Sequence, residues 1–236
     1  MNSSDPRVQA QTEAIGVEQL ASVRSQFLMR VYGHLAAAIL VFVMIEVALF
    51  KSGLAVDITR ALTGVNWLFV LGGFMGIAWL GRSFAYKAGS VGSQYLGLGI
   101  YVVGQAIIFV PLLFMADYYA PGAISSAALI TLIGFTLLTM VALSMRNNFS
   151  FLGGILRWAG ILALLAIVGG VIFGFELGTW FSVAMVGVAG AAVLYDTQKI
   201  LVTFPDDRYV GAALELFASI ALMFWYVLRL LMGSRR

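Results

Sequence analysis

The chain of 236 residues contains no cysteine and little charge. The absence of cysteine excludes disulfides, thiolate metal sites and cysteine nucleophiles. Only 11% of the residues are charged, whereas 61% are hydrophobic and the mean hydropathy is +0.98, which is far from the composition of soluble globular domains. The composition therefore indicates an integral membrane protein, and the length allows one compact domain.

The sequence also lacks the residue patterns that nucleic-acid binding and enzymatic catalysis need. The basic residues, which give a formal charge of +3, are scattered and mostly flank apolar runs, so membrane topology explains them better than nucleic-acid binding. His34 is the single histidine, no P-loop is present, and the serines have no base at a recognisable spacing. We therefore expect no nucleic-acid partner, no enzymatic activity and no cofactor.

What the sequence does contain is long apolar runs. A bilayer core of about 30 Å needs roughly 20 apolar residues as a helix, and short connections predict antiparallel neighbours in a bundle. The sequence therefore predicts an all-α, polytopic fold with seven transmembrane helices, at approximately 31–50, 65–80, 94–116, 123–145, 151–173, 180–203 and 209–232. The second run is the shortest, and its true start could lie nearer Thr59.

A polar leader, residues 1–29, precedes the seven-helix domain of residues 30–236. The leader lacks the apolar core of a cleaved signal peptide, so the first span must act as an uncleaved signal. A short amphipathic helix at the membrane interface and, before residue 15, a frayed tail are both compatible with the leader. The helix is indicated by apolar residues at steps of three and four, namely Val17, Leu20, Val23 and Phe27.

The distribution of lysine and arginine predicts the orientation. Of the 14 basic residues, nine lie in the leader or flank the even-numbered loops, and the remaining five lie on the other side. This excess predicts a cytoplasmic N-terminus, and we expect a multi-pass protein of the cell (inner) membrane. The nine are Arg7, Arg24, Arg30, Arg82, Lys87, Arg146, Arg157, Lys199 and Arg208.

Glycines recur at a four-residue spacing in two spans. Gly72 with Gly76, and Gly170 with Gly174, form the small-xxx-small pattern that lets helix backbones approach closely. With 26 glycines in the chain, chance explains such spacings equally well.

Carboxylates inside the last two spans are the main candidates for chemistry. An ionisable group at a helix centre costs at least about 2.5 kcal/mol and needs a partner, water or a function. Asp196 and Glu215 should lie at similar depth on consecutive antiparallel helices. If they face each other, a proton or a bound cation must offset the repulsion, and calcium prefers such oxygen ligands. In the structural alternative, Asp196 pairs with Lys199 or Arg82, and Glu215 faces water near the surface.

Three other ionisable residues lie on the first span. Arg30 and His34 are one helical turn apart at its entry, where they could sense pH or simply anchor the helix near lipid headgroups. Glu46, near the other end of the same helix, could line a vestibule on the far side or have a structural role.

The stretch "AGAAVLYDTQKI", followed after a short loop by "AALELFASIALMFWYVLRLL", resembles the last two helices of the Bax inhibitor-1 / YccA-like family, the transmembrane Bax inhibitor motif proteins. The polar leader, the "FLMRVYGHLAA" entry to the first span and the number of spans extend the resemblance along the chain. The resemblance implies a seven-helix bundle around the last helix. It also implies a pH-sensitive calcium leak through a pair of carboxylates on helices six and seven.

The resemblance assigns the first carboxylate to Asp196 and places Ser219 where many relatives have an aspartate. Glu215 lies on the same helix face as Ser219, one turn earlier, so it could replace the missing acid. Alternatively Asp196 stands as a lone acid and the cation pathway is weakened. Some bacterial relatives imply a different function, in which the protein transports nothing and instead binds and restrains a membrane protease.

Overall fold

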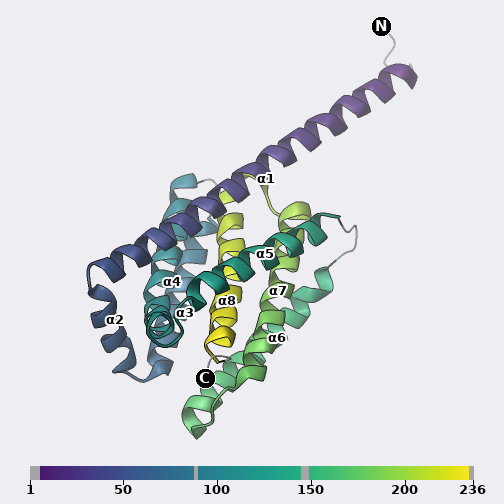
Figure 1. Cartoon of the computed structure of the whole chain (residues 1–236). Helices are drawn as coiled ribbons and strands as arrows, with labels where there is room; N and C mark the ends of the chain where they lie inside the picture. Colours follow the sequence, from purple (N-terminus) through teal and green to yellow (C-terminus); the bar gives the residue numbers. More distant parts are fainter. Residues whose placement is uncertain (1–5, 88–89, 145–148, 234–236) are drawn as a thin grey trace.

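The computed structural model describes residues 6–87, 90–144 and 149–233, with side chains from Ser22 onward. Within these ranges the chain forms eight α-helices and one short 3₁₀ turn (Figure 1). The helices are α1 (Pro6–Lys51), α2 (Leu54–Thr63), α3 (Trp67–Ala85), α4 (Val91–Tyr119), α5 (Ala123–Ser144), α6 (Ser150–Phe173), α7 (Thr179–Val202) and α8 (Tyr209–Gly233), and the turn η1 (Asp206–Arg208) precedes α8.

The predicted seven spans are confirmed. Seven helices in the described ranges are long and apolar enough to cross a membrane, namely α1 from Ser22, α3, α4, α5, α6, α7 and α8 with its preceding turn. Met145, the predicted end of the fourth span, lies outside the described residues, as do Arg146, Arg235 and Arg236 of the orientation count. The apolar runs thus located the helices because the thickness of a bilayer fixes their minimum length.

The second span corrects one sequence expectation. Thr59 belongs to the separate short helix α2, and the second span begins only at Trp67. The break follows from residues 64–66, where Gly64 ends α2 and the Asn66 side chain accepts a hydrogen bond from the Leu68 N–H at 2.9 Å. An asparagine in this position caps a new helix, so the chain cannot continue as a single helix from Thr59.

The last helix lies at the centre of the bundle. Helix α8 packs against α1, α3, α4, α5 and α7, and more than half of its residues are buried. By contrast, α6 packs mainly on α7 and buries only Ala163. Figure 1 shows α8 in yellow between the surrounding helices. The bundle around the last helix is therefore as predicted.

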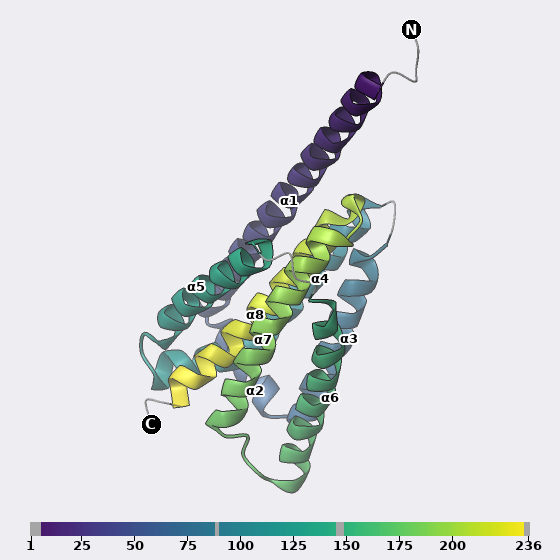
Figure 2. The ribbon, with the colours of Figure 1, turned by 90° about the vertical axis from the view of Figure 1, so that its right-hand side faces the viewer.

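The leader continues into the first span without a break. From Pro6 to Lys51, α1 is a single helix of 46 residues, and its N-terminal part extends beyond the bundle in both views (Figures 1 and 2). Within the bundle α1 buries one stripe at helical spacing, comprising Phe27, Val31, Leu35, Ala38 and Glu46. The fifth member of this stripe is a carboxylate, which an otherwise apolar helix face does not predict.

Close helix approach occurs at different glycines from those expected. A Cβ on Gly72 or Gly76 would meet no atom within 4 Å, and Gly174 ends α6 with a positive φ of 73°. Instead, α3 and α4 meet at Gly81 and Gly97, where a Cβ on Gly97 would lie 2.4 Å from both the Gly81 O and the Ala85 N. This contact brings the end of α3, with Arg82, close to the centre of the bundle.

Candidate functional site

Asp196 and Ser219 are in direct contact across the two last helices. The Ser219 hydroxyl on α8 donates a hydrogen bond to Asp196 Oδ2 on α7 at 2.5 Å. Ser219 is buried and Asp196 is half-buried. Ser219, where the resemblance implies a second acid, therefore does touch Asp196, although it brings a hydroxyl and no charge.

Glu215, one turn before Ser219, points toward α3. Its Oε1 accepts a hydrogen bond from the Tyr86 hydroxyl at 2.5 Å and lies 3.3 Å from Arg82 Nε. The Glu215 side chain is only 14% exposed. Burial, and then the Glu215 charge, raises the pKa of Tyr86, so the phenol keeps its proton and remains a donor. Arg82 also lies over the Tyr101 ring, with its Cζ 5.7 Å from the ring centroid.

The two acids thus have different partners but share one electrostatic environment. Asp196 interacts electrostatically with Glu215, Lys199 and Arg82. Among the described residues, however, no basic nitrogen lies within the 4.0 Å ion-pair distance of the Asp196 carboxylate. Arg82, one of the two basic partners considered for Asp196, pairs with Glu215. The Asp196 charge is therefore stabilised by a hydroxyl and by neighbouring charges at longer range.

This arrangement can attract a proton or a cation, because a carboxylate in a bilayer helix gains from either. The possible metal ligands here are carboxylate and hydroxyl oxygens, the type of ligand that calcium prefers. Within the described ranges no three histidine, aspartate or glutamate side chains lie together as a ready metal site. A calcium ion held by Asp196 and Ser219, with or without Glu215, would need water or backbone carbonyls to complete its shell.

Arg30 and His34 lie in a separate cluster of aromatic residues. One His34 ring nitrogen contacts the Arg30 carbonyl and the other the Tyr95 hydroxyl, each at 2.6 Å. The His34 ring also packs 5.1 Å from that of Tyr209, and the Arg30 guanidinium lies 5.5 Å from the same ring. These contacts connect α1, α4 and the start of α8. Within the described residues, no hydrogen bond, ion pair or ring contact links Arg30 or His34 to Asp196.

Arg24 makes the largest set of polar contacts among the described side chains, and no sequence pattern indicated this role beyond its charge. The guanidinium donates to the carbonyls of Leu201 and Phe204, both at 3.0 Å, and to that of Ile200. It also pairs with Asp206 at 2.6 Å. A cation on the free carbonyls at a helix C-terminus is favourable, so Arg24 fastens α1 to the connection between α7 and α8.

Glu46 lies in the other half of the bundle. It is 7% exposed, and neither carboxylate oxygen has a hydrogen-bond partner in the described structure. It lines a cavity between α1, α4, α5 and α8.

The family model for the inhibitor of apoptosis-promoting Bax1 matches residues 24–236. The chain belongs to this family. The match covers all seven membrane-spanning helices and confirms the resemblance carried by the Tyr-Asp motif of α7. Among the curated proteins, no match to the chain is found. In this Bax inhibitor-1 family member the matched region begins at Arg24, the residue that joins α1 to the end of α7, and leaves residues 1–23 outside.

Proposed function

We propose that this Bax inhibitor-1 family protein conducts cations across the membrane and responds to protons, with calcium as the expected ion. The site comprises Asp196, Ser219 and Glu215, at the end of the bundle where the N-terminal end of α8 lies. The observation that carries the proposal is the Asp196 carboxylate, which lies within a membrane helix with a hydroxyl donor and without an ion pair among the described residues. Such a group is stabilised by a proton or by a passing cation.

In this proposal Arg82 competes with the cation. Its guanidinium is 3.3 Å from Glu215, so it neutralises the acid that could otherwise strengthen the site. Glu215 therefore contributes to conduction only when Arg82 moves away. While Arg82 pairs with Glu215, Asp196 alone attracts the cation. When Arg82 moves away, the Glu215 carboxylate adds a second negative charge to the site.

A non-transporting regulator that binds and restrains a membrane protease is the second candidate. The feature that favours it is the N-terminal part of α1, which extends past the bundle as a continuous helix and offers a surface to a partner (Figure 2). Under either function the protein acts without enzymatic chemistry or a cofactor. We propose a location in the cell (inner) membrane, and the basic-residue count supports an N-terminus in the cytoplasm.

Calcium flux into liposomes that contain the purified protein distinguishes the two candidates. We expect flux that depends on pH between about pH 5 and about pH 8, and its loss in Asp196→Asn, which has no charge at any pH. Asp57→Asn is the matched control, because Asp57 is an exposed acid in α2 that pairs only with exposed Arg60. A purified protein that leaks no calcium across this range would remove the conduction proposal and leave the regulator.

A further inference from the structure

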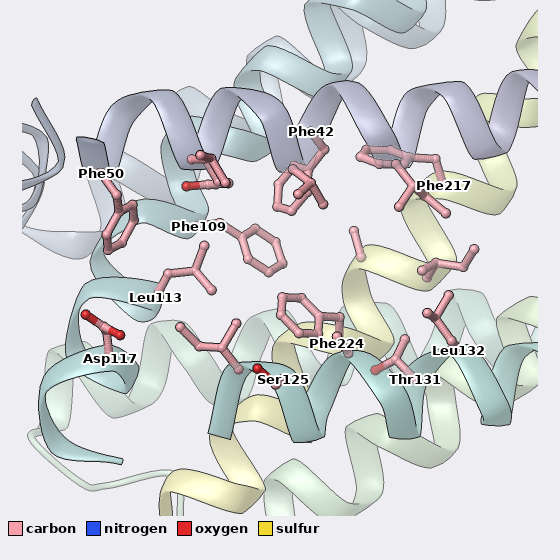
Figure 3. Close-up of a pocket in the computed structure, with 18 residues that line it drawn as sticks. Phe42, Phe50, Phe109, Leu113, Asp117, Ser125, Thr131, Leu132, Phe217 and Phe224 are labelled. Atoms are coloured by element: carbon pink, nitrogen blue, oxygen red, sulfur yellow. The ribbon is translucent and has the colours of Figure 1, made fainter. Parts of the chain in front are cut away.

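A cavity of about 470 Å³ lies between α1, α4, α5 and α8 (Figure 3). Its wall is largely aromatic and aliphatic, with five phenylalanines: Phe42, Phe50, Phe109, Phe217 and Phe224. Figure 3 shows these rings around the central space, with Asp117 at one end and Thr131 on α5. The volume lies within the range of small-molecule pockets, roughly 300–1,000 Å³.

Two buried polar side chains of the cavity are unsatisfied, and one of them is an acid. Both oxygens of buried Glu46 and the hydroxyl of buried Thr131 lack a hydrogen-bond partner in the described structure. Asp117 is a second acid in the lining, and no lysine, arginine or histidine is among the lining residues. An unpartnered carboxylate in an apolar site is costly, so Glu46 is stabilised either by a proton or by an occupant that brings positive charge and hydrogen-bond donors.

The cavity is separate from the Asp196 site. Helix α8 contributes Phe217, Ile220, Ala221 and Phe224 to the lining, whereas Ser219 and Glu215 face α7 and α3. Around a helix of 3.6 residues per turn, Glu215 and Ser219 each lie at least about 100° from every lining residue of α8. Helix α8 thus separates the two sites.

We propose that this cavity binds an amphiphilic ammonium, with the charged amine on Glu46 and the apolar body among the phenylalanine rings. An ammonium supplies the missing charge and hydrogen-bond donors for the two Glu46 oxygens. The aromatic faces add a cation–π attraction. A neutral apolar molecule would leave Glu46 unpaired, an anion would be repelled by two acids, and a calcium ion would find too few oxygen ligands among apolar walls.

The occupant enters from the bilayer. Val43, Val47 and Leu132 line the cavity and are 47%, 46% and 48% exposed, so the rim is apolar and faces lipid. The ammonium can therefore come from a free lipophilic amine or from the ethanolamine headgroup of a phospholipid. Both present the same chemistry to Glu46.

The test measures octylamine binding to the full chain in nanodiscs of phosphatidylglycerol, whose headgroup carries no ammonium, through the shift of the thermal unfolding midpoint with amine concentration. Octylamine is charged at neutral pH, and octanol is its neutral counterpart. We expect octylamine to raise the midpoint of the wild type, and Glu46→Gln to weaken the apparent affinity by at least about tenfold. Octanol should act equally on both proteins. Glu176→Gln, at an exposed acid outside the cavity, and Asp196→Asn should bind octylamine as the wild type does.

A second variant keeps the test decisive if Glu46→Gln fails to fold. Ala128→Phe fills the cavity from α5 while leaving Glu46 in place, and it should also abolish the octylamine shift. Discs that include phosphatidylethanolamine separate the two sources. If its headgroup occupies the cavity, these discs already raise the thermal unfolding midpoint, and added octylamine has little further effect. An unchanged octylamine effect in these discs indicates a free amine. Equal octylamine shifts in the wild type, Glu46→Gln and Ala128→Phe would overturn the proposal, as would an octanol shift that depends on Glu46.

Discussion

Ser219 on α8 donates its hydroxyl hydrogen to the Asp196 carboxylate on α7, with 2.5 Å between the two oxygens. This contact stabilises the ionised form of Asp196 without cancelling its charge, because a hydroxyl is a neutral donor. Ser219 is also the position at which related proteins are expected to have a second acid. The two helices thus bring one carboxylate and one hydroxyl into contact at this position.

Calcium binding at Asp196 should weaken as the pH falls. A proton and a calcium ion compete for the same carboxylate, so protonation removes the charge that attracts the cation. Once the carboxyl begins to bind protons, the apparent affinity should fall by up to about tenfold per pH unit. Isothermal calorimetry in nanodiscs measures this slope. Asp196→Asn should bind weakly at every pH, and a slope that persists in that variant would assign the competition to another group.

Ser219→Asp should tighten calcium binding and enlarge the pH response. The new carboxylate would replace the hydroxyl that now touches Asp196, and the repulsion between two acids is relieved by a proton or a cation. We expect affinity higher by about tenfold, or about 1.4 kcal/mol, in the same calorimetric titration. Ser219→Ala is the control that removes the hydrogen bond without adding charge. No gain in affinity over Ser219→Ala would show that the geometry does not permit a shared ion.

Arg82→Gln and Glu215→Gln should change calcium flux in opposite directions. Removing Arg82 leaves the Glu215 charge without the guanidinium that lies 3.3 Å away, so flux should rise. Removing the Glu215 charge eliminates this second acid, so flux should fall. Liposome flux at a single neutral pH is sufficient for the comparison. A change in the same direction for both variants would mean that the pair acts through packing.

Gly97→Ala should destabilise the contact between α3 and α4. The added methyl group would lie 2.4 Å from backbone atoms of Gly81 and Ala85, and neither backbone can move without shifting its helix. Overpacking of this kind costs roughly 1–3 kcal/mol. Gly99→Ala, where a Cβ meets no atom within 4 Å, is the matched control. Thermal unfolding in the same detergent should separate the two variants, and coincident midpoints would contradict the close approach.

Arg24→Ala should loosen the connection between α7 and α8. The substitution removes donors to three carbonyls and the ion pair with Asp206, at a cost of roughly 1–3 kcal/mol. Hydrogen exchange of the backbone at residues 199–208 reports the change locally. Arg60→Ala, which removes an arginine with a 78% exposed side chain, should leave that exchange unaltered. Unchanged protection in Arg24→Ala would mean that water replaces the guanidinium at no cost.

The sequence predicted the spans well because each must be apolar over the thickness of a bilayer, whatever its neighbours are. It also indicated Asp196 as a candidate site residue, because a carboxylate is conspicuous in an apolar run. It did not predict which side chain reaches Asp196, because Ser219 and Glu215 share one face of α8 and their partners depend on how α3 and α7 pack against it. Tyr86 is 129 positions from Glu215 in the chain, and no local pattern connects them.

The uninterrupted course of α1 has a mechanical consequence for the proposed ion site. A continuous helix resists bending, so the part of α1 outside the bundle should move as one rigid body with the part that is packed along the stripe from Phe27 to Ala38. Arg24 connects α1 to the segment between α7 and α8, which lies between Asp196 and Glu215 in the chain. Force applied to the outer end of α1 would therefore be transmitted to the spacing of the two acids, without any ligand entering the bundle.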